Sequence, residues 1–83
     1  MKVLYFAWVR QKIGTGEEHL ALPAGVTTIA ELIGFLRMRG NGYAEAFENP
    51  GMLRAAVNQE HTLFDKNICD TDEIAFFPPV TGG

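Results

Sequence analysis

The chain has 83 residues, of which 47% are hydrophobic and 11% aromatic, so it is large enough to form one small domain with a packed core. The formal net charge of -3 and the scattered basic residues argue against nucleic-acid binding, which requires a clustered basic face. No apolar run approaches the roughly 20 residues that cross a bilayer, and the N-terminus lacks the pattern of a signal peptide. The single cysteine, Cys69, cannot form an internal disulfide. We therefore expect a cytoplasmic protein with no membrane contact, in which Cys69 is a small, partly buried apolar residue.

The first half of the sequence predicts two strands and a helix. Residues Val3 to Val9 are rich in β-branched and aromatic side chains, and Glu18 to Leu22 alternates in polarity, so the two segments predict a hairpin with a long loop at Gly14-Thr15-Gly16. Thr28 and Glu31 then have the spacing of a capping box. Apolar residues follow at the spacing of one helical face: Ile29, Leu32, Ile33 and Leu36. Gly34 lies within this helix, and we expect it to mark close packing against a strand.

The second half predicts a short helix and three further strands. The helix is expected from Tyr43 to Glu48 and ends at Asn49-Pro50-Gly51. Strands are expected over three segments, with a turn around Gln59-Glu60 between the first two: Leu53 to Asn58, Thr62 to Phe64, and Glu73 to Phe77. Pro78-Pro79 ends the last strand, because proline cannot donate to a sheet ladder.

This order of elements predicts an α+β fold of the β-grasp, or ubiquitin-like, type. A hairpin, a helix that crosses it, and returning strands together form a mixed sheet of about five strands packed on one main helix. Residues 1–77 would form the domain, and residues 78–83 an extended C-terminal tail.

The sequence shows no self-contained active site. The two histidines, His19 and His61, are far apart and do not have metal-ligand spacing, and no glycine-rich phosphate loop is present. Adjacent carboxylates, as at Glu17-Glu18, point to opposite faces of a strand and are expected to be solvated charges. We therefore predict no metal site, no permanently bound cofactor and no catalytic residue within the domain.

The remaining candidate is the tail, which ends in Thr81-Gly82-Gly83. Two prolines favour an extended conformation that could reach about 20 Å from the domain, at roughly 3.3 Å per residue. Glycines without side chains would let the terminal carboxylate enter a narrow channel in another protein. That carboxylate is ionised and a poor electrophile, so a partner must activate it. A frayed terminus without a function is the alternative.

A docking surface follows from the alternation of the last strand. Ile74 and Phe76 share one face of the strand, and Ala75 and Phe77 share the other. If the first strand directs alternate residues towards the helix, then Leu4 and Phe6 join Phe77 on the open face. An exposed apolar patch of this kind favours a site for a protein partner.

The sequence resembles the small, sulfur-carrier subunits of molybdopterin synthase along its whole length. The closing stretch is the most specific part, and the segments from 37 to 50 are the least similar. The matching stretches are Val3-Leu4-Tyr5-Phe6-Ala7, Val26-Thr27-Thr28-Ile29-Ala30-Glu31-Leu32, Ala56-Val57-Asn58-Gln59 and Asp72-Glu73-Ile74-Ala75-Phe76-Phe77-Pro78-Pro79-Val80-Thr81-Gly82-Gly83.

The resemblance implies a non-catalytic subunit of a sulfur-transfer complex. An adenylyltransferase related to ubiquitin activators would charge Gly83 with ATP and magnesium, and a persulfide donor would convert it to a thiocarboxylate. The large synthase subunit, which would hold the catalytic residues, would use this sulfur to build the dithiolene from cyclic pyranopterin monophosphate. Gly82 and Thr81 would provide clearance in the channel. The expected partner-binding residues are Leu4, Phe6, Phe77, Pro78, Pro79 and Val80.

Other functions have the same tail chemistry. A sulfur carrier for thiazole synthesis would share the chemistry of the terminal carboxylate, although the Phe-Phe-Pro-Pro-Val-Thr run favours the molybdenum pathway. A ubiquitin-like modifier would instead form lysine-linked adducts. A plain β-grasp interaction domain would not need Gly82 and Gly83 at all.

Overall fold

The computed structural model describes residues 1–79 of the chain. Its helical segments are α1 (Ala7–Ile13), α2 (Ile29–Arg37), α3 (Asn41–Ala46) and the short 3-10 turn η1 (Pro50–Met52). Its strands are β1 (Lys2–Tyr5), β2 (Glu17–His19), β3 (Arg54–Val57), β4 (Glu60–Thr62) and β5 (Glu73–Phe77). None of the helices in this part of the chain is long and apolar enough to cross a membrane.

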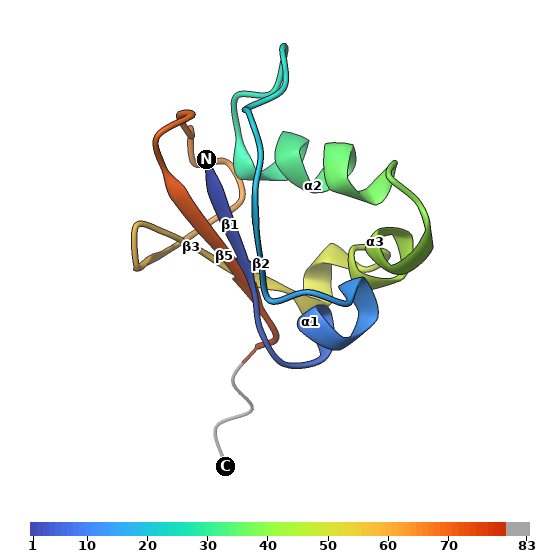
Figure 1. Ribbon diagram of the computed structural model, residues 1–83. Coiled ribbons are helices and arrows are strands. Elements are labelled where there is room, and N and C mark those ends of the chain that lie inside the picture. The colour runs from blue at the N-terminus through green and yellow to red at the C-terminus, as the bar shows by residue number, and fades with distance from the viewer. Residues whose placement is uncertain (80–83) are drawn as a thin grey trace.

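The strands form one mixed sheet in the order β2-β1-β5-β3-β4. The last strand, β5, lies in the centre, parallel to β1 and antiparallel to β3 (Figure 1). The outer strands β2 and β4 each pair with one neighbour, in antiparallel hairpins. This topology confirms the predicted β-grasp sheet and places the strand that leads into the tail between two partners.

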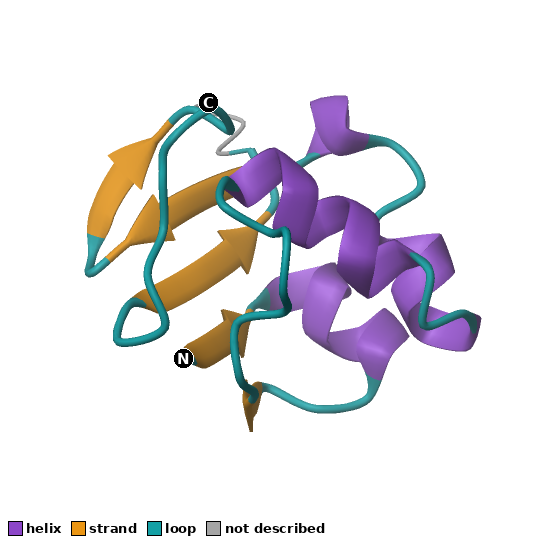
Figure 2. Cartoon of the chain, turned by 90° about the horizontal axis from the view of Figure 1, so that it is seen from above, coloured by secondary structure: helices purple, strands orange, loops and turns teal. Residues whose placement is uncertain are grey.

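The helices lie together on one side of the sheet (Figure 2). The stripe of α2 is buried as predicted, and it packs against the inward-facing side chains of β1, β3 and β5. The predicted capping box begins α2: the Glu31 N–H donates to Thr28 Oγ1 at 3.2 Å, and the Thr28 N–H donates to Glu31 Oε1 at 3.1 Å. The core includes three fully buried rings in contact, Tyr5, Phe47 and Phe76.

The prediction of a strand from Val3 to Val9 is wrong beyond Tyr5. The chain instead turns at Phe6 and Ala7, where Ala7 has a left-handed φ of 53°, and enters helix α1. Val9 is buried on the inner face of that helix, and Gly14 ends it in a left-handed conformation. The β-type composition of this segment concealed the i, i+4 spacing of Val9 and Ile13.

Three smaller expectations also differ from the structure. Gly34 does not mark a close approach, since a Cβ at this position would meet no heavy atom within 4 Å. The turn between β3 and β4 is at Asn58 and Gln59, both with positive φ, one residue earlier than expected, and β4 begins two residues earlier, at Glu60. The predicted second strand, Glu18 to Leu22, is formed over Glu17–His19 only.

Candidate functional site at the base of the tail

The tail follows the best-anchored strand of the sheet. Strand β5 ends at Phe77, as predicted, and Pro78 and Pro79 continue from it half-buried. The other residues assigned to the tail chemistry, Val80, Thr81, Gly82 and Gly83, lie outside the described residues. The geometry of the site therefore concerns the base of the tail and the surface around it.

Phe76 fixes this base to the core. Its ring is fully buried, with its centroid 5.1 Å from the Phe47 ring and 6.4 Å from the Tyr5 ring. Its carbonyl oxygen accepts a 3.1 Å hydrogen bond from the Phe6 N–H, which ties the end of β5 to the start of α1. Because backbone and side chain are both held, the tail leaves from a rigid point.

The face of the sheet opposite the helices carries the predicted apolar patch. Val3, Tyr5, Ile74 and Phe76 are buried against the helices. Leu4 and Ala75 lie opposite each other on β1 and β5 and are half-buried, as is Phe77. Phe6 continues beyond β1 in an extended conformation and is 48% exposed. Ala56, the register partner of Ala75, faces the same side but is buried, so we call the residues Leu4, Phe6, Ala75 and Phe77 the open face.

Charged residues border the open face at both ends, and sequence reasoning missed their arrangement. At the end far from the tail, Lys2 Nζ lies 3.9 Å from a Glu17 oxygen and 4.0 Å from a Glu73 oxygen. At the tail end, Arg54 is the register partner of Phe77, and the His61 ring centroid lies 5.0 Å from that of Phe77. Only the strand register brings these residues together, so no spacing within the sequence indicates them.

A polar cluster around Glu18 binds the hydroxyl group of Tyr5. The Glu18 carboxylate accepts hydrogen bonds from the Tyr5 hydroxyl at 2.7 Å, the Tyr43 hydroxyl at 2.6 Å and Arg39 Nη1 at 2.8 Å. The Arg39 guanidinium also lies 4.5 Å from the centre of the Tyr43 ring. One carboxylate thus connects β2, β1, α3 and the segment after α2.

The pKa values of this cluster reflect these contacts. Burial of Glu18 by itself would raise its pKa, but the hydrogen bonds from Tyr43, Arg39 and Tyr5 outweigh burial and lower it. Burial raises the pKa of Tyr5, and its bond to Glu18 raises it further, so Tyr5 remains a neutral donor. The cluster is therefore built to hold a carboxylate in its charged form, in a structural role.

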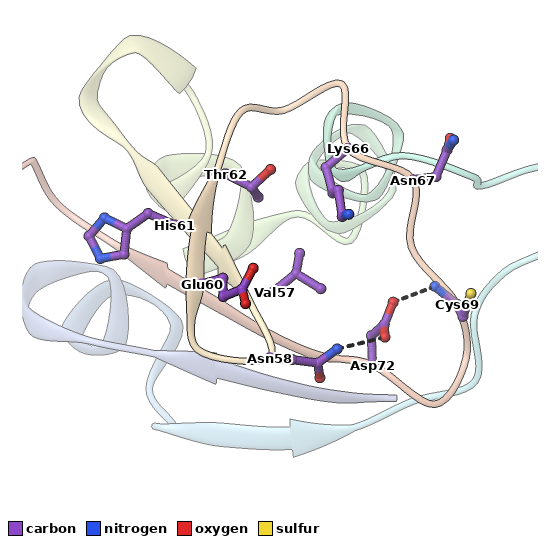
Figure 3. A pocket seen from close by; sticks show the side chains of 9 residues that line it. All are labelled: Val57, Asn58, Glu60, His61, Thr62, Lys66, Asn67, Cys69 and Asp72. Carbon is purple, nitrogen blue, oxygen red and sulfur yellow. Dashed lines mark hydrogen bonds between the residues drawn. The ribbon is translucent and has the colours of Figure 1, made fainter.

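A polar pocket of about 380 Å³ lies at the opposite end of β5 from the tail (Figure 3). Its polar groups stabilise the loop before β5. The Asp72 carboxylate accepts hydrogen bonds from the Cys69 N–H at 2.7 Å and from Asn58 Nδ2 at 2.9 Å. Cys69 is exposed, so the expectation that it is partly buried is wrong. Within residues 1–79, no three His, Cys, Asp or Glu side chains gather as a metal site would require.

A mixed sheet that grasps a helix, with its last strand in the centre, defines a ubiquitin-like β-grasp protein. The fold is shared with the small archaeal modifier protein SAMP1 from Haloferax volcanii, which is 23% identical and superposes with a TM-score of 0.73, over 100% of this chain and 98% of that one. The ThiS family matches residues 3–83, and the chain belongs to this family.

Two relatives are similar to this chain over almost their whole length. The molybdopterin synthase sulfur carrier subunit of Escherichia coli K12 is 45% identical over 83 residues, which cover 100% of this chain and 99% of the relative. The protein of the same name from Haemophilus influenzae is 37% identical, with the same coverage. The likeness to this group, expected from the sequence, is confirmed.

Proposed function

We propose that this chain is the sulfur carrier subunit of a molybdopterin synthase. The observation that carries the proposal is the 45% identity to a protein of that name across the full chain, with no gap in coverage at the tail. The domain supplies a rigid base and a docking surface, and the C-terminal residue Gly83 supplies the reactive group.

The chemistry begins at the terminal carboxylate. Attack on an ionised carboxylate would place negative charge on negative charge, so a partner adenylyltransferase first transfers AMP from ATP to Gly83, with magnesium, and releases pyrophosphate. The outer sulfur of a persulfide donor then attacks the acyl carbon, and AMP leaves, which gives an acyl disulfide. A thiol cleaves its S–S bond and leaves as a disulfide with the donor. The product is a thiocarboxylate on Gly83, which donates its sulfur to cyclic pyranopterin monophosphate within the large subunit.

The residues of this chain position that group and bind the partners. The rigid junction at Phe76 would define where the tail starts, and the absence of a side chain at Gly82 would leave room for it in the partner's channel. The open face would dock the large subunit, with Leu4, Phe6 and Phe77 as its apolar contacts and Pro78, Pro79 and Val80 along the path of the tail. A half-buried aromatic residue beside a fixed backbone suits such an anchor.

Intact-mass measurement tests the proposal. The purified chain is incubated with its adenylyltransferase, ATP, magnesium and a sulfur donor, and we expect a mass increase equal to the replacement of one oxygen by sulfur. The Cys69→Ser variant is the matched control, because Cys69 is exposed and could itself gain a persulfide. A persulfide adds sulfur without loss of oxygen, so the two products differ in mass. A chain that never gains the thiocarboxylate mass would contradict the proposal.

Two further outcomes would assign a different pathway. A thiocarboxylated chain that co-purifies with a thiazole synthase, and not with the large molybdopterin synthase subunit, would be a thiazole-type carrier. Lysine-linked adducts of the chain in cells would identify a protein modifier. Removal of Gly82 and Gly83 would abolish activity in each of these cases, and only an interaction domain would tolerate it.

A further inference from the structure

Arg54 is a cation placed beside the apolar anchor of the open face. It begins β3 and is the direct register partner of Phe77, the last residue of β5. The next residue, Ala55, is buried in the core, so alternation directs Arg54 to the face that Phe77 occupies. Arg54 is exposed. Any protein that covers Phe77 must therefore also cover part of this side chain.

The guanidinium of Arg54 is held in place by neutral acceptors. Nη1 donates to the Leu53 carbonyl oxygen at 2.8 Å and to the Gly51 carbonyl oxygen at 3.5 Å. No carboxylate of residues 1–79 lies within ion-pair distance of it, whereas Lys2, at the other end of the face, lies near two. The charge of Arg54 is thus uncompensated in this part of the chain, and most of its five N–H donors remain available.

His61 extends the same polar edge. It lies on β4, in register with Ala56, and its ring is tilted by 52° against the ring of Phe77. Figure 3 shows this ring pointing away from the other side chains of the polar pocket. Because His61 and Arg54 both adjoin Phe77, His61 can present a ring nitrogen to the same partner that covers Phe77.

An apolar groove adjoins Arg54 on its other side. The groove has a volume of about 540 Å³, and Leu53, Leu63 and Phe64 are among its lining residues. Leu63 is 76% exposed. Arg54 therefore borders two apolar surfaces, and a partner that covers both removes water from the guanidinium.

The free-energy cost of burying the Arg54 guanidinium indicates which group the partner must present. A guanidinium cannot lose its proton, so Arg54 cannot become neutral when it is buried. A buried charge without a counter-ion costs several kcal/mol, which would cancel the gain from covering Phe77. A carboxylate relieves the cost, because its two oxygens match two parallel N–H donors.

We infer that the protein docked on the open face presents an Asp or Glu carboxylate to Arg54, within hydrogen-bonding reach of His61. This inference rests on the proposed function, which makes the large synthase subunit that protein. It assigns to Arg54 a role in partner selection: the apolar residues provide contact area, and the ion pair discriminates against a surface that lacks an acidic side chain at this point.

The test is the affinity of the full chain for the large subunit of the same organism, measured by calorimetry at low and high salt. We expect Arg54→Glu to weaken binding about tenfold or more, because two carboxylates would then face each other. We expect Arg54→Leu to weaken binding and to make the affinity less dependent on salt than that of the wild type. The control is Arg37→Glu, an equal charge change at an exposed cation on α2, away from the open face.

The results separate this inference from the proposed function. Equal affinity and equal salt dependence for wild type, Arg54→Leu and Arg54→Glu would overturn the inference, while thiocarboxylate formation would still support the carrier. Equal weakening by Arg37→Glu would also overturn it, because net charge alone would explain the effect. Circular dichroism of each variant confirms that the affinity is that of folded protein.

Discussion

Gly42 lies directly against the backbone of Lys12. A Cβ atom on Gly42 would be 1.8 Å from the Lys12 carbonyl oxygen and 2.8 Å from its carbonyl carbon. This contact joins α3 to the end of α1, and the ion pair of Lys12 with Glu45, at 3.6 Å, lies at the same junction. The absence of a side chain at Gly42 therefore sets how closely the two short helices pack.

Substitution of Gly42 by alanine should destabilise the protein. The clash is with backbone atoms, so α1 and α3 must separate, and we expect a loss of about 3 kcal/mol in the free energy of unfolding. The matched control is Gly34→Ala, where the added methyl group meets nothing within 4 Å inside helix α2. That variant should be more stable by about 0.5–1 kcal/mol. Urea denaturation measures both, and a neutral Gly42→Ala would disprove the close contact.

Loss of the Glu18 charge should loosen the connection between the hairpin and the helices. Glu18→Gln keeps the size but cannot accept as strongly from Tyr5, Tyr43 and Arg39 together, and we expect a loss of about 2 kcal/mol. Glu17→Gln, one residue earlier on the exposed side of β2, should change stability by less than about 0.5 kcal/mol. Similar losses for both variants would show that the cluster contributes nothing specific.

The stability difference between the wild type and Glu18→Gln should depend on pH. The pKa of Glu18 in the folded protein is lower than its ordinary value of 4.5, so its contribution to stability is fully present above that pH. It is lost as the pH falls through the lowered folded value. The difference in unfolding free energy between wild type and Glu18→Gln should therefore shrink below about pH 4.5. Glu31 and Asp70 also have lowered pKa values, so the variant keeps some acid sensitivity. A difference that stays constant with falling pH would contradict this account.

Phe77 should contribute strongly to the affinity for the large subunit. Phe77→Ala removes the ring at the base of the tail, and we expect affinity to fall at least tenfold, about 1.4 kcal/mol or more. Phe35 on α2 is also partly exposed, at 37%, but lies on the helical side of the molecule, so Phe35→Ala should bind as the wild type does. Calorimetry on both variants distinguishes the open face from the helical side as the docking surface.

Local signals in the sequence predicted the elements that depend on neighbouring residues. The capping box predicted the start of α2, because the side chains of Thr28 and Glu31 each accept a hydrogen bond from the other's backbone N–H. Pro78 predicted the end of β5, because it has no N–H to donate to the sheet. Helix α1 was missed, although Gly14 after Arg10 and Lys12 is the usual end of a helix. Its aromatic residues outweighed that signal.

The contacts that define the site could not be predicted in this way. Glu18 meets Tyr5, Arg39 and Tyr43 across separations of 13, 21 and 25 residues, and these contacts exist only once the elements have packed. The pairing of Arg54 with Phe77 depends on strand register, which a shift of one residue would abolish. The apolar residues of the open face could be predicted, because alternation along β5 depends only on neighbouring residues. The charged residues that border this face could not be predicted.

The central position of β5 has a consequence for protein synthesis. Of the five strands in residues 1–79, β5 leaves the ribosome last, yet it separates β1 from β3. Until it emerges, no strand joins the β1–β2 pair to the β3–β4 pair, and two-stranded sheets are marginal in water. A product truncated before Glu73 thus cannot assemble the sheet, and cellular proteases would remove it. A partner that recognises the assembled sheet would therefore bind only chains translated at least as far as the base of the tail.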